Sequence, residues 1–186
     1  MGTDKAFVPL LGRPMIEHVL ARVANLGQAE TFIVTNTPDH YRSFGLPLYT
    51  DVIPGAGSLG GIYSALSHAQ TPHALVIACD LPLASSALIC LLLAHAADSN
   101  GPYDAVVPRF EGTPQGLHAL YAQSARDAIA RFIAEKRYRI WELLQEVRTR
   151  YVDEPEYAHI DPDGRTFRNV NTPEDLAAVE QLLREE

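Results

Sequence analysis

The sequence predicts an α/β fold of three layers, α/β/α, with a mostly parallel sheet. Short apolar runs alternate with amphipathic stretches along the chain, a pattern typical of strands that alternate with helices. The run 74–79 (ALVIAC) is apolar throughout, as expected of a strand that is covered on both faces. The length of 186 residues fits one domain, so we expect residues 1–186 to form a single unit.

Seven stretches carry the spacing or the capping signals of helices. In the first, apolar residues recur at a helical period between Pro14, which suits a first turn, and Gly27, which suits a helix end. Gly45 ends the second, and Thr172 caps the last, with Pro173 in its first position. The predicted helices are 14–26, 39–44, 59–69, 85–97, 125–134, 139–147 and 173–183.

Short runs rich in apolar residues lie between these helices and predict strands. The polar stretch 154–165 is expected to be a surface loop. The predicted strands are 31–34, 47–52, 74–79, 104–108, 117–121, 149–152 and 167–170.

Composition and charge exclude several classes of protein. Hydrophobic residues make up 47% and charged residues 20%, which is ordinary for a globular protein. The net charge of −8 argues against general affinity for nucleic acid. The longest apolar run, residues 87–94, falls far short of the ~20 residues that span a bilayer. The two cysteines, Cys79 and Cys90, fit no metal or disulfide spacing, so we expect a reduced, cytoplasmic protein.

Polar residues that follow predicted strands are the first candidates for function, because ligands bind beyond the carboxyl ends of strands in such sheets. These residues are Asn36, Asp51, Asp80, Arg109, Asn169 and Asn171. Asp80 follows the most apolar strand and precedes Leu81-Pro82, so the chain must turn there. A carboxylate in that position suits a Mg²⁺ ion that also binds phosphates. The alternative is a carboxylate that only caps a turn or a helix.

A glycine-rich segment, Gly55 to Gly61, opens a predicted helix. Glycines allow a close approach of the backbone to a ligand, and the free N–H groups at a helix start attract anions. The spacing of Gly55, Gly57 and Gly60 also fits a dinucleotide fingerprint, with Asp80 lying 20 residues beyond Gly60. Against that interpretation, the preceding strand is short and Pro54 interrupts it. A plain glycine turn is the third interpretation.

Three further features carry charge or titratable groups. Lys5 precedes an apolar stretch and either meets phosphates or lies on the surface. His118 lies within a predicted strand. A histidine in such a position is more often a hydrogen-bonded core residue than a ligand or a base. The basic segment 136–139 either receives a phosphorylated substrate or is an exposed helix start.

Taken in order along the chain, these segments resemble the MobA-like nucleotidyltransferases, and among them the molybdenum cofactor guanylyltransferases most closely. The resemblance covers nearly the whole chain, and the ordered set of segments is more specific than any one of them. The resemblance implies a Rossmann-like α/β/α fold of the nucleotide-diphospho-sugar transferase type. The matching segments, in order, are MGTDKAFVPLLGRPMIEHVL, the strand end at Asn36, GLPLYTDVIPGAGSLGGIYSAL, CDLPL, LHALY, KRYRIWELL and FRNVNTPEDL.

The resemblance implies a role for each matching residue. Lys5 and Asp80 would be catalytic: Lys5 would bind nucleotide phosphates, and Asp80 would hold Mg²⁺ and touch the nucleotide. The nucleotide-binding residues would be Lys5, Asn36, Asp51, Asp80, Gly57, Gly60 and Gly61. The substrate-binding residues would be Ser58, which replaces the family's usual proline, Arg137, Asn169 and Asn171.

The front of the chain departs from the family. The family opens with a buried strand and a loop of the form LAGGxSxRMG, whereas this sequence begins at Met1-Gly2. We therefore expect the first strand of the sheet to be missing and the domain to be N-terminally incomplete. An LAGG-like stretch encoded in frame upstream of Met1 would support this expectation. A stop codon there would instead indicate a pseudoenzyme.

The reaction implied by the resemblance is transfer of GMP from GTP to the phosphate of molybdopterin, with release of pyrophosphate. The expected ligands are GTP, molybdopterin and Mg²⁺, with no nucleic acid and no membrane. Transient contact with other cofactor-biosynthesis proteins or with molybdoenzymes is expected. Three alternatives stay open: a cytidylyltransferase of the same fold, a non-catalytic subunit that binds a nucleotide or a partner, and a dinucleotide-binding oxidoreductase.

Overall fold

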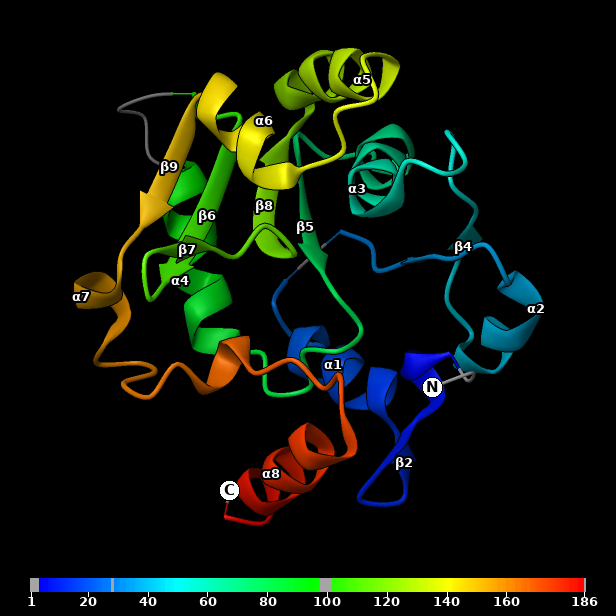
Figure 1. Ribbon diagram of the computed structural model, residues 1–186, viewed down its shortest axis with the longest axis vertical. Coiled ribbons are helices and arrows are strands. Elements are labelled where there is room, and N and C mark those ends of the chain that lie inside the picture. The colour runs from blue at the N-terminus through cyan, green and yellow to red at the C-terminus, as the bar shows by residue number, and fades with distance from the viewer. Residues whose placement is uncertain (1–3, 28, 98–101, 186) are drawn as a thin grey trace.

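The computed structural model describes residues 4–27, 29–97 and 102–185. A central sheet lies between helices, and a smaller group of elements at one end carries both ends of the described chain (Figure 1). The α-helices are α1 (Met15–Val23), α2 (Pro38–Tyr41), α3 (Gly57–His68), α4 (Ser86–Ala97), α5 (Arg126–Ala134), α6 (Ile140–Glu146), α7 (Glu154–Tyr157) and α8 (Pro173–Arg184). Short 3₁₀ turns cover Lys5–Phe7, Arg42–Phe44, Gln123–Ala125 and Arg165–Phe167.

Strands β5, β8, β6 and β9 form the body of the central sheet, in that order. β7 continues β6 as an antiparallel hairpin, while β3 pairs with β4 in parallel and β1 with β2 in an antiparallel hairpin. The strands are β1 (Pro9–Leu10), β2 (Arg13–Pro14), β3 (Ile33–Val34), β4 (Leu48–Tyr49), β5 (His73–Ile77), β6 (Ala105–Phe110), β7 (Thr113–Pro114), β8 (His118–Ala122) and β9 (Thr149–Val152).

The α/β class predicted from the sequence is confirmed, while the strand directions of the central sheet are mixed rather than mostly parallel. β8 runs antiparallel to both β5 and β6, with His118 opposite Ile77. Only residues 111–117 connect β6 to β8, too few for the crossover that a parallel pair needs. β9 pairs with β6 in parallel, so β5, β6 and β9 end at the same edge of the sheet.

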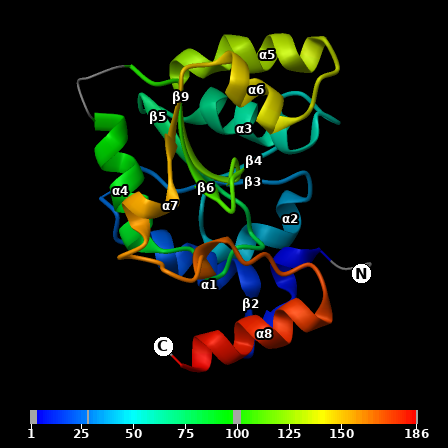
Figure 2. The same ribbon diagram turned by 60° about the vertical axis from the view of Figure 1, so that its left-hand side comes forward.

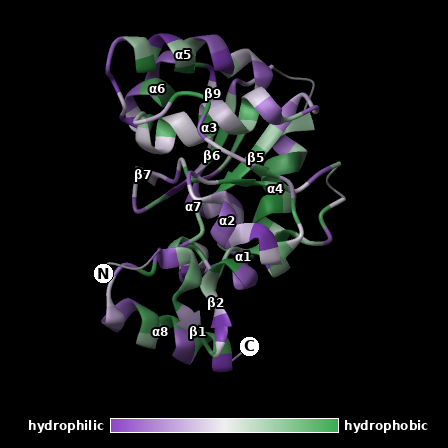
Figure 3. Cartoon of the chain, turned by 90° about the vertical axis from the view of Figure 1, so that its right-hand side faces the viewer, coloured by the Kyte–Doolittle hydropathy of each residue, from purple (hydrophilic) through white to green (hydrophobic). Residues whose placement is uncertain are grey.

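Helices cover both faces of this sheet (Figure 2). On one face α3, α5 and α6 pack on the strands through residues such as Leu59, Phe132 and Leu144. On the other face α4 packs through Leu88 and Leu92. Figure 3 shows α4 as hydrophobic along most of its length, whereas the outer helices alternate between polar and apolar residues. All five residues of β8 are buried, which places the core at this strand.

β5 is less buried than the apolar run 74–79 predicts. Of its five residues only Ala74 is buried, and the other four are half-buried. β8 is its ladder partner on one side, and among the described residues no strand pairs with its other side. The β3–β4 pair lies beyond that side in Figure 1. An unpartnered strand edge leaves the side chains next to it partly accessible, which explains the difference.

The predicted strand 167–170 is wrong. The structure has a 3₁₀ turn at Arg165–Phe167 followed by an irregular segment. The carboxylate of Asp161 accepts hydrogen bonds from the backbone N–H groups of Arg165 and Thr166, both at 2.9 Å, and this favours a turn over a ladder. The buried side chains of Phe167 and Val170 account for the apolar pattern. The stretch 154–165, expected as loop, contains the short helix α7.

Within the part of the chain that the structure describes, none of the helices combines the length and the apolar character needed to cross a membrane.

Asp104 joins three parts of the fold. Its carboxylate accepts hydrogen bonds from the Ser124 hydroxyl at 2.5 Å and from the backbone and side chain of Arg148 at 2.9–3.2 Å. Burial alone would raise the pKa of Asp104, but these hydrogen bonds outweigh it and hold that pKa below its usual range. The stabilisation is therefore present above about pH 4 and is lost as the pH falls through the folded-state value.

We predict that Asp104→Asn lowers the free energy of unfolding by about 1–3 kcal/mol at pH 7, the range for hydrogen bonds to charged groups. The difference from the parent should shrink as the pH falls below about 4, because the Asp104 carboxyl of the unfolded chain then takes up its proton before that of the folded chain. Urea unfolding at pH 7 and at a pH below 4 measures this difference. Asp127→Asn, on the exposed start of α5, is the control. A difference that does not change with pH would contradict the assignment.

Candidate active site

The segment that carries Lys5 forms a tight turn before β1. Asp4 caps this turn, because its Oδ1 accepts a hydrogen bond from the Ala6 N–H at 3.1 Å. The Phe7 and Val8 N–H groups donate to the carbonyls of Asp4 and Lys5, each at 3.1 Å. The turn therefore fixes the backbone from which the Lys5 side chain extends.

Three segments that are distant in the sequence meet at Lys5. Its ammonium donates a hydrogen bond to Asn171 Oδ1 and lies 3.9 Å from Asp80 Oδ2. The Val170 N–H donates to the Asp80 carbonyl at 3.0 Å, which brings the C-terminal segment to the end of β5. Asp175, in the first turn of α8, accepts from the Asn171 N–H at 3.0 Å and holds that residue in place. The structure thus brings together three of the predicted residues.

Asp80 is a carboxylate with an unused oxygen. Its side chain is 19% exposed, and Oδ1 is buried with no hydrogen-bond partner in the described part of the chain. Burial raises the pKa of Asp80, while the Lys5 ammonium lowers it. Burial also raises the pKa of the neighbouring Cys79 thiol to about 11, so that thiol is protonated at neutral pH. A buried carboxylate oxygen without a partner is unusual, because buried polar atoms are nearly always hydrogen-bonded.

Asn36 and Asp51 form a second predicted group, beyond the β3–β4 pair. The Asn36 amide donates to Asp51 Oδ2 at 2.8 Å, and the Asp51 N–H donates to Asn36 Oδ1 at 3.2 Å. The next N–H along the chain, of Val52, donates to Ser64 Oγ on α3 at 2.9 Å. This bond ties the Asp51 segment to the helix that the glycine-rich segment opens.

The glycine-rich segment has the backbone that its sequence suggests. Gly55 and Gly57 have φ of +80° and +58°, a region that favours glycine. α3 begins at Gly57, no side-chain hydrogen bond from its N-cap residue Ala56 caps it, and the Gly60 N–H donates to the Ala56 carbonyl at 3.2 Å. A Cβ at Gly60 would lie 2.9 Å from the Cβ of Ala56, whereas Gly61 has open space. Gly57 and Ser58 are exposed.

Two further predicted substrate residues lie apart from the contacts of Lys5. Asn169 is exposed, two residues before Asn171. Arg137 packs its guanidinium over the Phe132 ring at 3.9 Å and pairs with three carboxylates, those of Glu135, Glu142 and Glu146. These pairs raise the pKa of Arg137 and engage its donors within the helix pair α5–α6. A role for Arg137 in binding phosphate stays a prediction.

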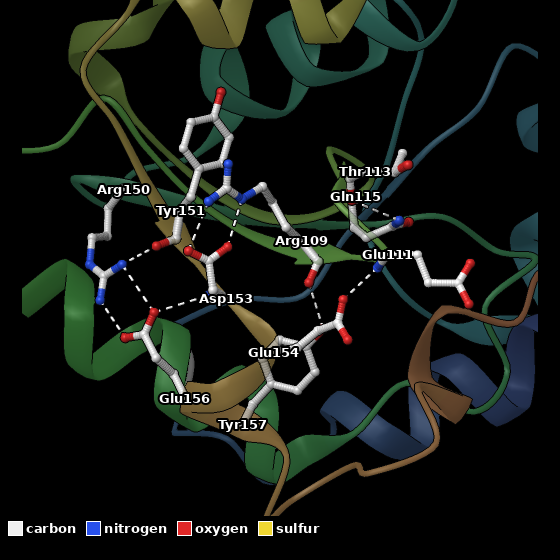
Figure 4. Close-up of polar contacts among 10 residues, drawn as sticks. All are labelled: Arg109, Glu111, Thr113, Gln115, Arg150, Tyr151, Asp153, Glu154, Glu156 and Tyr157. Atoms are coloured by element: carbon white, nitrogen blue, oxygen red, sulfur yellow. Dashed lines mark hydrogen bonds and ion pairs between the residues drawn. The ribbon is translucent and has the colours of Figure 1, made fainter.

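Arg109, the remaining strand-end residue, lies in a polar network that sequence reasoning missed (Figure 4). Its guanidinium lies over the Tyr151 ring and donates to both carboxylate oxygens of Asp153, at 2.6 and 2.8 Å. Glu154 accepts from the Glu111 N–H at 2.6 Å. A cavity of about 650 Å³ opens here, lined by Arg109, Gly112, Asp153, Glu154, Pro155 and Ala158. The signal in the sequence was that Asp153 also follows a strand.

His118 is a core residue, as its position in an apolar strand suggests. It is 1% exposed, and its ring meets the ring of Phe167 edge-on. Burial lowers the pKa of His118 to about 4, so the imidazole is neutral at pH 7. Neither ring nitrogen has a hydrogen-bond partner within the described residues, which differs from the hydrogen-bonded histidine expected.

A lysine, a partly buried carboxylate and a glycine-rich helix start in an α/β fold form an arrangement suited to an anionic ligand such as a nucleotide. Residues 1–151 match the family model of the MobA-like NTP transferase domain. The chain therefore belongs to the MobA-like NTP transferase family, as its sequence segments suggested. Nucleotidyltransferases of this family generally use a divalent metal ion.

Named relatives extend over almost the whole chain. A protein of Methanothermobacter thermautotrophicus, "Probable molybdenum cofactor guanylyltransferase", is 31% identical over 95% of this chain and 90% of its own length. The "Molybdenum cofactor guanylyltransferase" of Desulfosudis oleivorans is 32% identical over 98% of this chain and 89% of its own.

Solved structures share the fold. The "Molybdopterin-guanine dinucleotide biosynthesis protein A" of Archaeoglobus fulgidus superposes with a TM-score of 0.85 at 26% identity, covering 100% of this chain and 93% of the other. The 2-C-methyl-D-erythritol 4-phosphate cytidylyltransferase of Thermus thermophilus matches 97% of this chain and 94% of its own at a TM-score of 0.72. At 19% identity, this second likeness supports the fold alone.

The contact between Lys5 and Asp80 is testable by titration. Because the ammonium lowers the pKa of Asp80, Lys5→Ala should move the titration of that carboxyl to higher pH. Carbon NMR of protein labelled at the aspartate carboxyls measures this shift. Lys136, the other lysine of the chain, supplies the control Lys136→Ala. An equal titration of Asp80 in the parent and in Lys5→Ala would show that the two groups do not interact.

Proposed function

We propose that this chain transfers GMP from GTP to the phosphate of molybdopterin and releases pyrophosphate. The observation that supports this most directly is the meeting of Lys5, Asp80 and Asn171 at the end of β5, in a chain whose named relatives are molybdenum cofactor guanylyltransferases. In this reaction a phosphate oxygen of the acceptor forms a bond to the α-phosphorus of GTP, and the bond to pyrophosphate breaks. The attacking oxygen is already anionic, so positioning and charge neutralisation are the main requirements.

In this proposal different residues of the chain contact different parts of the nucleotide. Lys5 offsets negative charge on the departing pyrophosphate. The N–H groups at the glycine-rich start of α3, with Gly57, Gly60 and Gly61, lie against the nucleotide. The braced pair of Asn36 and Asp51 meets the base, because a carboxylate and an amide supply the acceptors that the N–H groups of guanine require. The acceptor side takes Ser58, Asn169 and Asn171.

The residues around Asp80 fit a divalent cation, which we assign as Mg²⁺. Asp80 Oδ1 is buried with no hydrogen-bond partner in the described part of the chain. The Lys5 ammonium lies 3.9 Å from Asp80 Oδ2 and also lowers the pKa of Asp175. Within the described residues no three His, Cys, Asp or Glu side chains converge into a complete metal site. That suits Mg²⁺, which takes one or two carboxylates and completes its shell with phosphates and water. When bound, it supplies Lewis-acid neutralisation of phosphate charge.

Ligand-dependent melting tests the nucleotide. A ligand that binds the folded state alone adds about 2.7 kcal/mol of stability at 100 times its dissociation constant. We expect GTP to raise the melting temperature of the 186-residue chain in the presence of Mg²⁺, and less without it. Stabilisation by CTP alone would indicate a cytidylyltransferase. Stabilisation by NADH without Mg²⁺ would indicate an oxidoreductase.

Substitution of Asp80 tests the metal ligand. Asp80→Ala should lose nearly all turnover of GTP and molybdopterin to pyrophosphate while the melting temperature without ligand stays within a few degrees. The control is Asp127→Ala, which removes an exposed carboxylate from α5. Turnover of Asp80→Ala within tenfold of the parent would refute a metal-binding role for this carboxylate.

A further inference from the structure

Tyr41 contacts the turn that carries Lys5 through Asp4, the residue before that lysine. Its side chain is 5% exposed, and its hydroxyl donates a hydrogen bond to Asp4 Oδ2 at 2.7 Å. Tyr41 ends α2, a helix of four residues that packs on neither face of the central sheet. No pattern in the sequence singles this tyrosine out, and the proposed reaction does not use it directly.

Tyr41 and the Asp4 cap together occupy both oxygens of one carboxylate. Oδ1 receives the Ala6 N–H, and Oδ2 receives the Tyr41 hydroxyl. Both oxygens of the Asp4 carboxylate therefore already have hydrogen-bond partners. The Lys5 ammonium contacts Asn171 and Asp80. Without the hydroxyl, Oδ2 would lose its partner, and Lys5 is the next residue in the chain. A carboxylate that turns toward Lys5 would draw the ammonium away from the nucleotide phosphates.

Tyr41 also reaches the base side of the candidate site. Thr35, which directly precedes Asn36 at the end of β3, lies near enough to the Tyr41 hydroxyl to lower its pKa. The hydroxyl therefore lies between the turn that carries Lys5 and the strand end that carries Asn36. Burial, and then Asp4, raise the pKa of Tyr41 above its usual value, so the hydroxyl stays protonated at neutral pH.

The surroundings of Tyr41 keep its ring in place independently of the hydroxyl. The Phe7 ring packs against it edge-on, with 4.9 Å between the ring centroids, and Phe44 lies at 6.1 Å. Ala6, Ile16 and Ile33 complete this small core. Tyr41→Phe therefore removes the hydroxyl and keeps the packing, which separates positioning from folding.

We propose that Tyr41 is a positioning residue: through Asp4 it holds the Lys5 ammonium at the phosphate end of the nucleotide. This inference rests on the proposed function for the role of Lys5. It assigns no chemistry to the tyrosine itself, which touches neither Asp80 nor Asn171 among the contacts of the described residues.

The test is the affinity for inorganic pyrophosphate with Mg²⁺, measured calorimetrically on the full chain. Pyrophosphate is the product that Lys5 would contact, so its affinity reports the placement of the ammonium without any requirement for turnover. The variants are Tyr41→Phe, Lys5→Ala and the double variant. Tyr157→Phe is the matched control, because that tyrosine is 1% exposed and donates to the Arg109 carbonyl at 2.5 Å, away from Lys5.

We expect Tyr41→Phe to weaken pyrophosphate binding about tenfold, the effect of one hydrogen bond to a charged group, and Tyr157→Phe to change it less than twofold. In the Lys5→Ala background the effect of Tyr41→Phe should vanish, because the tyrosine acts through Lys5. An effect of the same size in both backgrounds would overturn the inference, as would equal affinities for Tyr41→Phe and Tyr157→Phe.

Assay of GMP transfer by the parent distinguishes the two proposals. If the parent binds pyrophosphate with the expected dependence on Lys5 and Tyr41 but transfers no GMP, the positioning role stands and the proposed function fails. If the parent transfers GMP and Tyr41→Phe matches Tyr157→Phe, the proposed function stands and the positioning role fails. A parent that does not bind pyrophosphate overturns the placement of Lys5 and, with it, the role of Tyr41.

Discussion

A partly buried carboxylate at the end of β5 is the constraint on which the candidate site depends. Asp80 is too enclosed to be solvated fully, so its charge requires a nearby cation. The Lys5 ammonium meets part of that requirement, and it does so only because the N-terminal turn and the C-terminal segment both pack at the same strand end. The electrostatic requirement of one side chain thus joins segments from opposite ends of the chain. Among the described residues, Oδ1 of Asp80 has no hydrogen-bond partner, so the requirement is met only in part.

The central sheet provides a rigid support for this arrangement. β8 is buried throughout and runs against both neighbours, so it fixes β5 and β6 relative to each other. Their shared direction places the Asp80 and Arg109 positions at one edge, with Asp153 at the end of β9. Short polar contacts then adjust each group: Asp4 caps the Lys5 turn, and Asp175 holds Asn171. Packing sets the positions of the strands, and hydrogen bonds set those of the side chains.

Much of the fold could be predicted from the sequence, for local reasons, and three of the predicted site residues, Lys5, Asp80 and Asn171, do meet in the structure. Helix and strand positions follow from apolar period and from caps, as at Thr172 and Asp175 of α8, which form the capping box. The run 167–170 was assigned wrongly, because two buried residues in an irregular segment produce the same alternation as a strand. The direction of β8 was not foreseen either, because it depends on the length of its connection to β6.

By itself, the sequence determined the α/β class, the family and the identity of the residues around the strand ends, because these depend on local pattern and on an ordered set of segments. Only the tertiary structure decided which of those residues meet. In the folded chain Lys5 hydrogen bonds to Asn171, and Arg137 forms ion pairs with three glutamates. The Tyr41 hydroxyl hydrogen bonds to Asp4. Contacts between residues 5 and 171 or 4 and 41 have no local signature, because they arise from how separate elements pack around a common core.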